Sequence, residues 1–118
     1  MSKHIVILED DVAFAETVAE ELQEEGFKVT LITQTQELPA LLRNKDVDLI
    51  LSDIMLEEAM GMDILKILKF KNEKIPIVFM TGFDGIPGLS EAMNDKMVID
   101  VLVKPFKISS LINLINKL

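Results

Sequence analysis

The sequence contains no cysteine, no tryptophan and no tyrosine, and histidine occurs only once. Without cysteine the chain cannot form disulfides, use a thiol nucleophile or build a zinc–thiolate site. This composition suits a reducing compartment. The first apolar run, Ile5–Leu8, is also too short for the core of a signal peptide or for a membrane span. The sequence therefore predicts a soluble, cytoplasmic protein that does not insert into a membrane.

Basic residues are scarce relative to acidic ones. Twelve lysines and arginines stand against twenty aspartates and glutamates, which gives a formal net charge of -8 at pH 7. An acidic chain repels phosphate backbones and anionic lipids, so the composition argues against nucleic-acid or membrane binding. Cations and basic protein surfaces are the expected partners.

Hydrophobic residues nevertheless make up 49% of the 118 residues, enough for one domain, residues 1–118, with a sizeable core. Many of them gather in five short runs: Ile5–Leu8, Val29–Ile32, Leu49–Leu51, Ile77–Met80 and Ile99–Val103. Between the runs, helical periodicity extends over about 12–25, 36–44, 61–71, 87–94 and 108–117. Continuous apolar runs that alternate with helices are typical of a parallel sheet covered on both faces. The sequence thus predicts an α/β fold, a (βα)5 sandwich of three layers.

Several single residues mark the expected helix ends. Gly26 is predicted to end the first helix, Pro39 fits only in the first turn of the second, and Ser109 is a suitable N-cap for the last. His4 begins the first strand beside the N-terminus, and we expect it to be exposed and without a chemical role.

Four of the apolar runs end in residues that can handle a phosphoryl group. These residues are Glu9, Asp10 and Asp11 after the first run, then Asp53, Thr81 and Lys104 after the third, fourth and fifth. Because parallel strands of one sheet end at the same edge, these side chains are expected to share a pocket. Clustered carboxylates repel one another, so either one is protonated or a cation neutralises them. Asp11 also suits the N-cap of the first helix.

Magnesium fits such a pocket, because it takes oxygen ligands from one or two carboxylates together with phosphate oxygens. With a metal bound, Asp53 could attack phosphorus as a carboxylate nucleophile. Lys104 and Thr81 would then donate to the phosphoryl oxygens.

The segments that contain these residues resemble the four signature motifs of response-regulator receiver domains from two-component signalling. They read IVILEDD at residues 5–11, DLILSDIML at 48–56, PIVFMTG at 76–82 and VKPF at 103–106. All four occur in the family's order at compatible spacings, and the similarity extends over essentially the whole chain. The resemblance implies a flavodoxin-like, doubly wound sheet with strand order 2-1-3-4-5.

The resemblance also implies a role for each matching residue. Asp53 corresponds to the phosphoacceptor, and Thr81 and Lys104 to the switch hydroxyl and the phosphate-binding lysine. The divalent cation, Mg²⁺ or Mn²⁺, would be held by a set of four groups: Glu9, Asp10, Asp53 and the main-chain carbonyl of Met55. Pro105 matches a proline that in this family typically follows a cis peptide bond.

The sequence departs from the family pattern at two informative positions. Val101 stands where the family often has an aromatic residue that turns inward on activation, and valine is too small to signal in that way. Glu57 replaces a proline that is usual after the phosphorylation site, and it adds negative charge near the pocket.

The predicted function is a phosphorylation-controlled switch and not an enzyme with an external substrate. A sensor histidine kinase or a phosphotransfer protein would donate the phosphoryl group, and the fourth helix, fifth strand and fifth helix would present the face that binds a downstream protein or a second copy. An alternative is a pseudo-receiver that binds partners without phosphorylation, which Val101 and Glu57 motivate. A hydrolytic phosphatase is disfavoured, because Met55 stands where such enzymes place a second aspartate as general acid.

Overall fold

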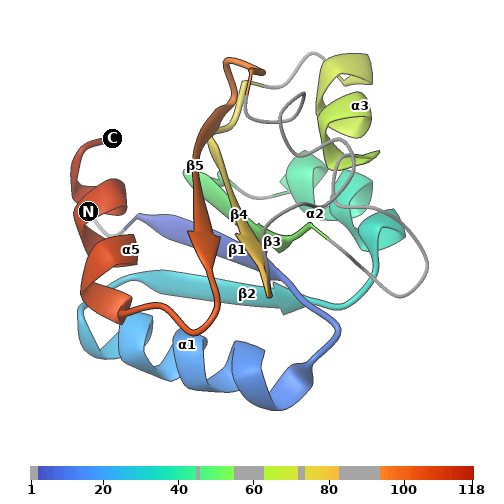
Figure 1. Ribbon diagram of the computed structural model, residues 1–118. Coiled ribbons are helices and arrows are strands. Elements are labelled where there is room, and N and C mark those ends of the chain that lie inside the picture. The colour runs from blue at the N-terminus through green and yellow to red at the C-terminus, as the bar shows by residue number, and fades with distance from the viewer. Residues whose placement is uncertain (1–2, 45, 55–62, 72–73, 83–93) are drawn as a thin grey trace.

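The fold was analysed in a computed structural model, which describes residues 3–44, 46–54, 63–71, 74–82 and 94–118 (Figure 1). The predicted fourth helix at 87–94 lies outside the described residues except for its last position. Met55 and Glu57 also lie outside them.

The centre of the molecule is a sheet of five parallel strands in the order β2-β1-β3-β4-β5. Its strands are β1 His4–Leu8, β2 Lys28–Ile32, β3 Leu49–Asp53, β4 Ile77–Thr81 and β5 Val98–Val103. Each predicted apolar run forms one of these strands, with boundaries that differ by no more than two residues. The predicted doubly wound topology is confirmed.

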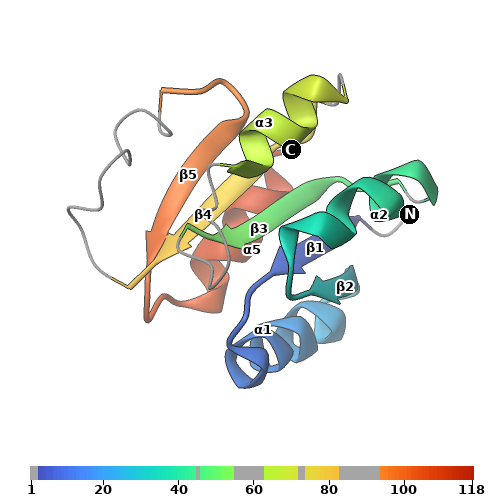
Figure 2. The ribbon, with the colours of Figure 1, turned by 90° about the vertical axis from the view of Figure 1, so that its right-hand side faces the viewer.

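Helices cover the sheet on both sides (Figures 1 and 2). One face carries α1, Val12–Glu24, and α5, Ile108–Asn116. The other carries α2, Leu38–Asn44, which follows a short 3₁₀ turn at Thr35–Glu37, and α3, Asp63–Phe70. None of the helices in the described ranges combines the length and apolar composition needed to span a bilayer.

The sheet divides the apolar core into two clusters, because successive residues of a strand point to opposite faces. In β1, Val6 and Leu8 join the cluster beneath α2 and α3, whereas Ile5 and Ile7 join the cluster beneath α1 and α5. All four side chains are fully buried. The pattern accounts for the uninterrupted hydrophobicity of this central strand.

The edge strands differ from the prediction that the sheet is covered on both faces. Ile99 and Val103 of β5 are 40% and 45% exposed, and Leu31 of β2 is 38% exposed. An edge strand has a neighbour on one side only and lies at the margin of the helical layers, so an apolar run there does not guarantee burial on both faces.

The helix ends follow the sequence signals in three of four cases. Asp11 caps α1 by accepting a hydrogen bond from the Phe14 N–H at 3.1 Å, and Gly26 follows the helix with a φ of 94°. Pro39 is the second residue of α2, where its missing N–H costs no intrahelical bond. The assignment of Ser109 as a cap is wrong: α5 begins at Ile108, so Ser109 already lies inside the helix.

The prediction that His4 is exposed is also wrong. His4 is only 9% exposed, and its ring forms hydrogen bonds to two other segments of the chain. Nδ1 lies 2.9 Å from the main-chain oxygen of Asp46, and Nε2 lies 2.7 Å from Oγ1 of Thr30. These two hydrogen-bond partners offset the cost of burying the imidazole. The position of His4 next to the N-terminus gave no sign of either contact.

Candidate functional site

The strand register brings the predicted site residues to one edge of the sheet, marked by the arrowheads in Figure 2. Leu8 pairs with Ser52 and Asp53 with Met80, so Glu9 follows β1 next to the end of β3. Thr81 pairs with Val103, and the Lys104 N–H donates to the Thr81 carbonyl at 2.7 Å. Four strands thus deliver Glu9, Asp53, Thr81 and Lys104 to the same place.

The side chain of Lys104 connects two of the acidic residues. Its Nζ donates to Oδ2 of Asp53 at 2.8 Å and also to Oε1 of Glu9. The side chains of Glu9, Asp53 and Lys104 are 2%, 14% and 21% exposed, so the cluster is largely shielded from water. Two carboxylates therefore share one ammonium group in a semi-buried site with a formal charge of -1.

Burial governs the acid–base properties of this cluster. Desolvation raises the pKa of Glu9 above its usual value, and the repulsion from Asp53 acts in the same direction, while the hydrogen bond from Lys104 opposes them. Desolvation also disfavours the ammonium of Lys104, but its hydrogen bonds to Asp53 and Glu9 outweigh this effect and raise its pKa. Lys104 therefore stays protonated at neutral pH.

Main-chain contacts hold the ends of the strands in place. The Ser52 hydroxyl donates to the Asp53 carbonyl at 2.9 Å, and the Asp11 N–H donates to Oε2 of Glu9 at 3.3 Å. The Lys104–Pro105 peptide bond is cis, as the resemblance implies. Thr81 is 1% exposed, so its hydroxyl belongs to the interior of the site.

The oxygen ligands of this cluster are of the chemical type that a hard divalent cation prefers. Glu9 and Asp53 direct carboxylate oxygens at one cationic group, and oxygen is the ligand atom that Mg²⁺ requires. Within the described ranges, however, no three acidic or histidine side chains come close enough together to hold a metal ion. Asp10 adjoins this edge, and the fourth expected ligand, the carbonyl of Met55, lies outside the described residues.

Sequence reasoning missed an aromatic component of the site. Nζ of Lys104 lies over the ring of Phe14, 4.5 Å from its centroid, and the Phe106 ring meets Phe14 nearly edge-on at 6.0 Å. The only available signal was position, since Phe14 falls in the first turn of α1 and Phe106 follows Lys104 by two residues.

Val101 is half-buried against the core cluster beneath α2 and α3. It pairs in register with Phe79, which precedes Thr81 by two residues and so points to the same face of the sheet. The valine therefore contributes to core packing on the face of the sheet to which Thr81 also belongs.

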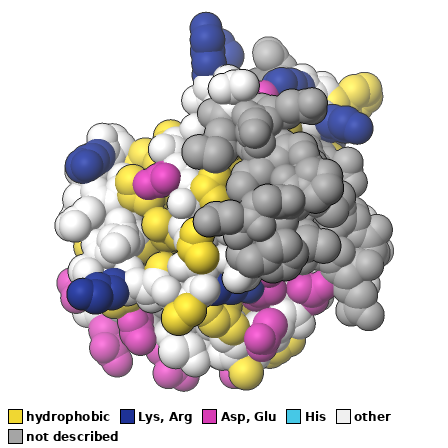
Figure 3. Space-filling model, viewed as in Figure 1, with side chains coloured by type: hydrophobic (Ala, Val, Ile, Leu, Met, Phe, Trp, Pro, Cys, Tyr) yellow, Lys and Arg dark blue, Asp and Glu magenta, His cyan; other side chains and the backbone are white. Residues whose placement is uncertain are grey.

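Charge is distributed unevenly over the surface (Figure 3). Acidic side chains gather along α1, where the exposed members are Glu16, Glu20, Glu21 and Glu24. Lysines occupy the region of α3 and the start of β5, where the exposed members are Lys66, Lys69, Lys71, Lys74 and Lys96.

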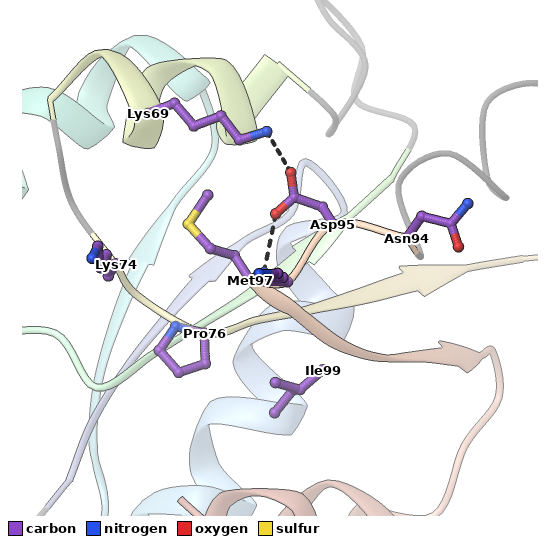
Figure 4. A pocket seen from close by; sticks show the side chains of 8 residues that line it. Lys69, Lys74, Pro76, Asn94, Asp95, Met97 and Ile99 are labelled. Atoms are coloured by element: carbon purple, nitrogen blue, oxygen red, sulfur yellow. Dashed lines mark hydrogen bonds and ion pairs between the residues drawn. The ribbon is translucent and has the colours of Figure 1, made fainter.

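A hollow of about 710 Å³ lies at the opposite end of β4 and β5 from Asp53 (Figure 4). Pro76, Met97 and Ile99 give it an apolar lining. At its margin Lys69 of α3 forms an ion pair with Asp95 at 2.5 Å, and Asp95 also accepts the Met97 N–H at 3.0 Å. This hollow is separate from the acidic cluster at the carboxyl edge.

The doubly wound sheet, with the Glu9–Lys104–Asp53 cluster at its carboxyl edge, has the flavodoxin-like architecture of receiver domains. A family model described as the response regulator receiver domain matches residues 5–116. The chain belongs to this family, the receiver domains of two-component systems.

Two curated relatives have the same level of similarity. The transcriptional regulatory protein FixJ of Bradyrhizobium diazoefficiens is 32% identical over 104 residues, which are 88% of this chain and 50% of that protein. The response regulator SaeR of Staphylococcus aureus is 32% identical over 119 residues, 98% of this chain and 50% of the relative. The chain therefore spans about half the length of these curated relatives.

Solved structures show the same fold. The receiver domain of the Francisella response regulator 1452 superposes with a TM-score of 0.84 at 26% identity, covering 98% of this chain and 95% of that one. The response regulator TrrA of Thermotoga maritima, solved in complex with Mg(2+)-BeF, gives a TM-score of 0.81 at 22% identity. That match covers 98% of this chain and 97% of the other, and it establishes the shared fold.

Proposed function

We propose that Asp53 accepts a phosphoryl group from the phosphohistidine of a sensor histidine kinase or a phosphotransfer protein. The ion cluster at the carboxyl edge carries this proposal, because Lys104 holds the Asp53 carboxylate by a 2.8 Å hydrogen bond. An ammonium group in that place can neutralise a phosphoryl oxygen once Asp53 is modified. Membership of the family supports the same assignment.

The proposed chemistry is a transfer between two protein side chains. A carboxylate oxygen of Asp53 attacks phosphorus, the phosphorus–nitrogen bond to the donor imidazole breaks, and the imidazole leaves with the bonding pair and takes a proton. The product is an acyl phosphate on Asp53. Lys104 and the hydroxyl of Thr81 donate to its oxygens.

The metal site is proposed to consist of the carboxylates of Glu9, Asp10 and Asp53 with the main-chain carbonyl of Met55. Mg²⁺ or Mn²⁺ bound there would neutralise the carboxylates and the charge that develops on the phosphoryl oxygens. Glu9 and Asp53 both support this proposal in the described structure, because each carboxylate is largely buried and already engages a cation.

Phosphorylation is proposed to shift the equilibrium between two conformations of the binding face. That face comprises the segment of the fourth helix together with β5 and α5, and it would bind a downstream protein or a second phosphorylated copy. Val101 has no ring that could turn inward. A conformational change at Thr81 must therefore reach the binding face through main-chain and packing contacts around β4 and β5. We place this single domain in the cytoplasm and assign it no nucleic-acid or membrane contact.

A second candidate is a pseudo-receiver that binds partners without phosphorylation. One observation favours it: the ammonium of Lys104 bridges Glu9 and Asp53, where a metal ion would otherwise balance their charge. If Lys104 keeps this position in solution, its ammonium offsets one of the two negative charges from within the protein.

The decisive experiment is incubation with Mg²⁺ and acetyl phosphate, followed by intact-mass measurement. We expect the wild type to gain one phosphoryl group and Asp53→Asn to gain none. Asp100→Asn is the matched control, because Asp100 is exposed on β5 and its loss leaves the site intact. A folded wild type that gains no mass with this donor or with a phosphorylated histidine kinase would contradict the switch and favour the pseudo-receiver.

A further inference from the structure

The ring of Phe14 forms one wall of the environment of the Lys104 ammonium. Nζ lies 4.5 Å from the ring centroid, close enough for the negative face of the ring to attract the cation. The same nitrogen donates to Asp53 and to Glu9. Two carboxylates and one aromatic face therefore hold the Lys104 ammonium. The aromatic face attracts the positive charge although it offers no nitrogen or oxygen atom as an acceptor.

The position of the Phe14 ring is fixed from two directions. Its N–H is bound by the N-cap Asp11 at 3.1 Å, which anchors the first turn of α1 below the site. The ring itself meets Phe106 at a centroid distance of 6.0 Å and an interplanar angle of 75°. Edge-to-face contact of this kind favours a defined ring orientation. Both rings are half-buried and pack against the core cluster beneath α1 and α5.

We propose that Phe14 is a positioning residue for Lys104, a role that rests on the proposed phosphoryl transfer to Asp53. If Glu9 held a metal ion, the Lys104 ammonium would have to release that carboxylate and then reach a phosphoryl oxygen. The ring holds the ammonium near Asp53 throughout this exchange. Because a cation–π contact leaves N–H groups available, it restrains the cation without competing with the phosphoryl oxygen.

The kinetic test compares variants of Phe14 in the full chain. Phe14→Leu keeps an apolar side chain but removes the aromatic face, and we expect its rate of phosphorylation by acetyl phosphate to fall about two- to fivefold. Phe14→Tyr keeps the face and is expected to restore a rate near that of the wild type. Phe27→Leu is the matched control, because Phe27 is also a half-buried residue packed against the same core cluster.

A spectroscopic readout tests the contact without any phosphorylation. Protons near an aromatic face are shifted upfield in NMR spectra, so the ε-methylene protons of Lys104 should show this shift in the wild type and in Phe14→Tyr but not in Phe14→Leu. Unshifted Lys104 protons in the wild type would overturn the proposal. So would a Phe14→Leu rate equal to that of the wild type, or an equal loss in Phe27→Leu.

The two readouts also separate this inference from the proposed function. If the folded wild type takes up no phosphoryl group, the proposed function fails, and the positioning role in transfer fails with it even where the upfield shift is present. If the wild type is phosphorylated but the shift and the rate difference are both absent, phosphoryl transfer stands and only the role of Phe14 is wrong.

Discussion

His4 connects three segments at the amino end of the sheet. Its N–H donates to Oδ2 of Asp48 at 2.7 Å, while the ring bridges the main-chain oxygen of Asp46 and the hydroxyl of Thr30. A carbonyl oxygen can only accept, so Nδ1 carries a proton, and in the neutral ring Nε2 accepts from the hydroxyl. The residue therefore links β1 to β2 and to the segment before β3.

We expect His4→Leu to lower the free energy of unfolding by about 1–3 kcal/mol, because it removes two part-buried hydrogen bonds, each of which contributes about 0.5–1.5 kcal/mol. Urea denaturation measures the change. Thr30→Val serves as the partner variant: the double variant should lose less than the sum of the two single ones, since both remove the same hydrogen bond. A loss below about 0.5 kcal/mol in His4→Leu would show that the contacts are not formed in solution.

At the scale of elements, the ion pair between Lys69 and Asp95 ties α3 to the segment that precedes β5. The hydrogen bond from Lys69 lowers the pKa of Asp95, and the N–H of Met97 contributes in the same direction. A carboxyl group whose pKa is lower in the folded state stabilises the fold above its unfolded pKa of about 4 and loses this contribution as the pH falls through the folded value.

Asp95→Asn should therefore be less stable than the wild type at pH 7, by about 0.2–1 kcal/mol, since Lys69 is 62% exposed and water screens the pair. The difference should shrink as the pH is lowered below about 4. Asparagine can still accept the Met97 N–H, so the variant isolates the charge. Lys71→Met, which alters an exposed lysine just after α3, should show no such pH dependence. A difference that is constant from pH 7 to pH 3 would argue against the ion pair.

At the scale of the whole molecule, a divalent cation that binds only the folded state must stabilise the entire domain. Because Glu9 follows β1 and Asp53 is the last residue of β3, their joint ligation requires the native sheet. We expect Mg²⁺ at one hundred times its dissociation constant to add about 2.7 kcal/mol to the free energy of unfolding of the wild type.

Thermal melts with and without Mg²⁺, at equal ionic strength, measure this effect. Glu9→Gln and Asp53→Asn should lose most of the increase in Tm, whereas Asp100→Asn should retain it. An equal increase in all four proteins would mean that the ion acts by screening and not at the proposed site.

Much of the architecture could be predicted because it depends on local patterns. Short runs of Val, Ile and Leu separated by helical periods correspond to the five strands, and Asp11 and Gly26 mark the ends of α1 as expected. The burial of the edge strands could not be predicted, because an apolar run has the same appearance at the centre of a sheet as at its margin. Ser109 failed as a cap because helix boundaries depend on backbone geometry that composition does not fix.

The sequence by itself determined the family, the order of the elements and the identity of the residues at the strand ends, since these follow from motifs and from a period of two or of 3.6 residues. Only the tertiary structure decided which groups meet. Lys104 contacts Asp53 across 51 positions and Glu9 across 95. The Phe14 ring reaches the site through Lys104, and the Phe106 ring reaches it through Phe14. Such contacts depend on strand register and on the packing of helices against the sheet, which are properties of the assembled fold.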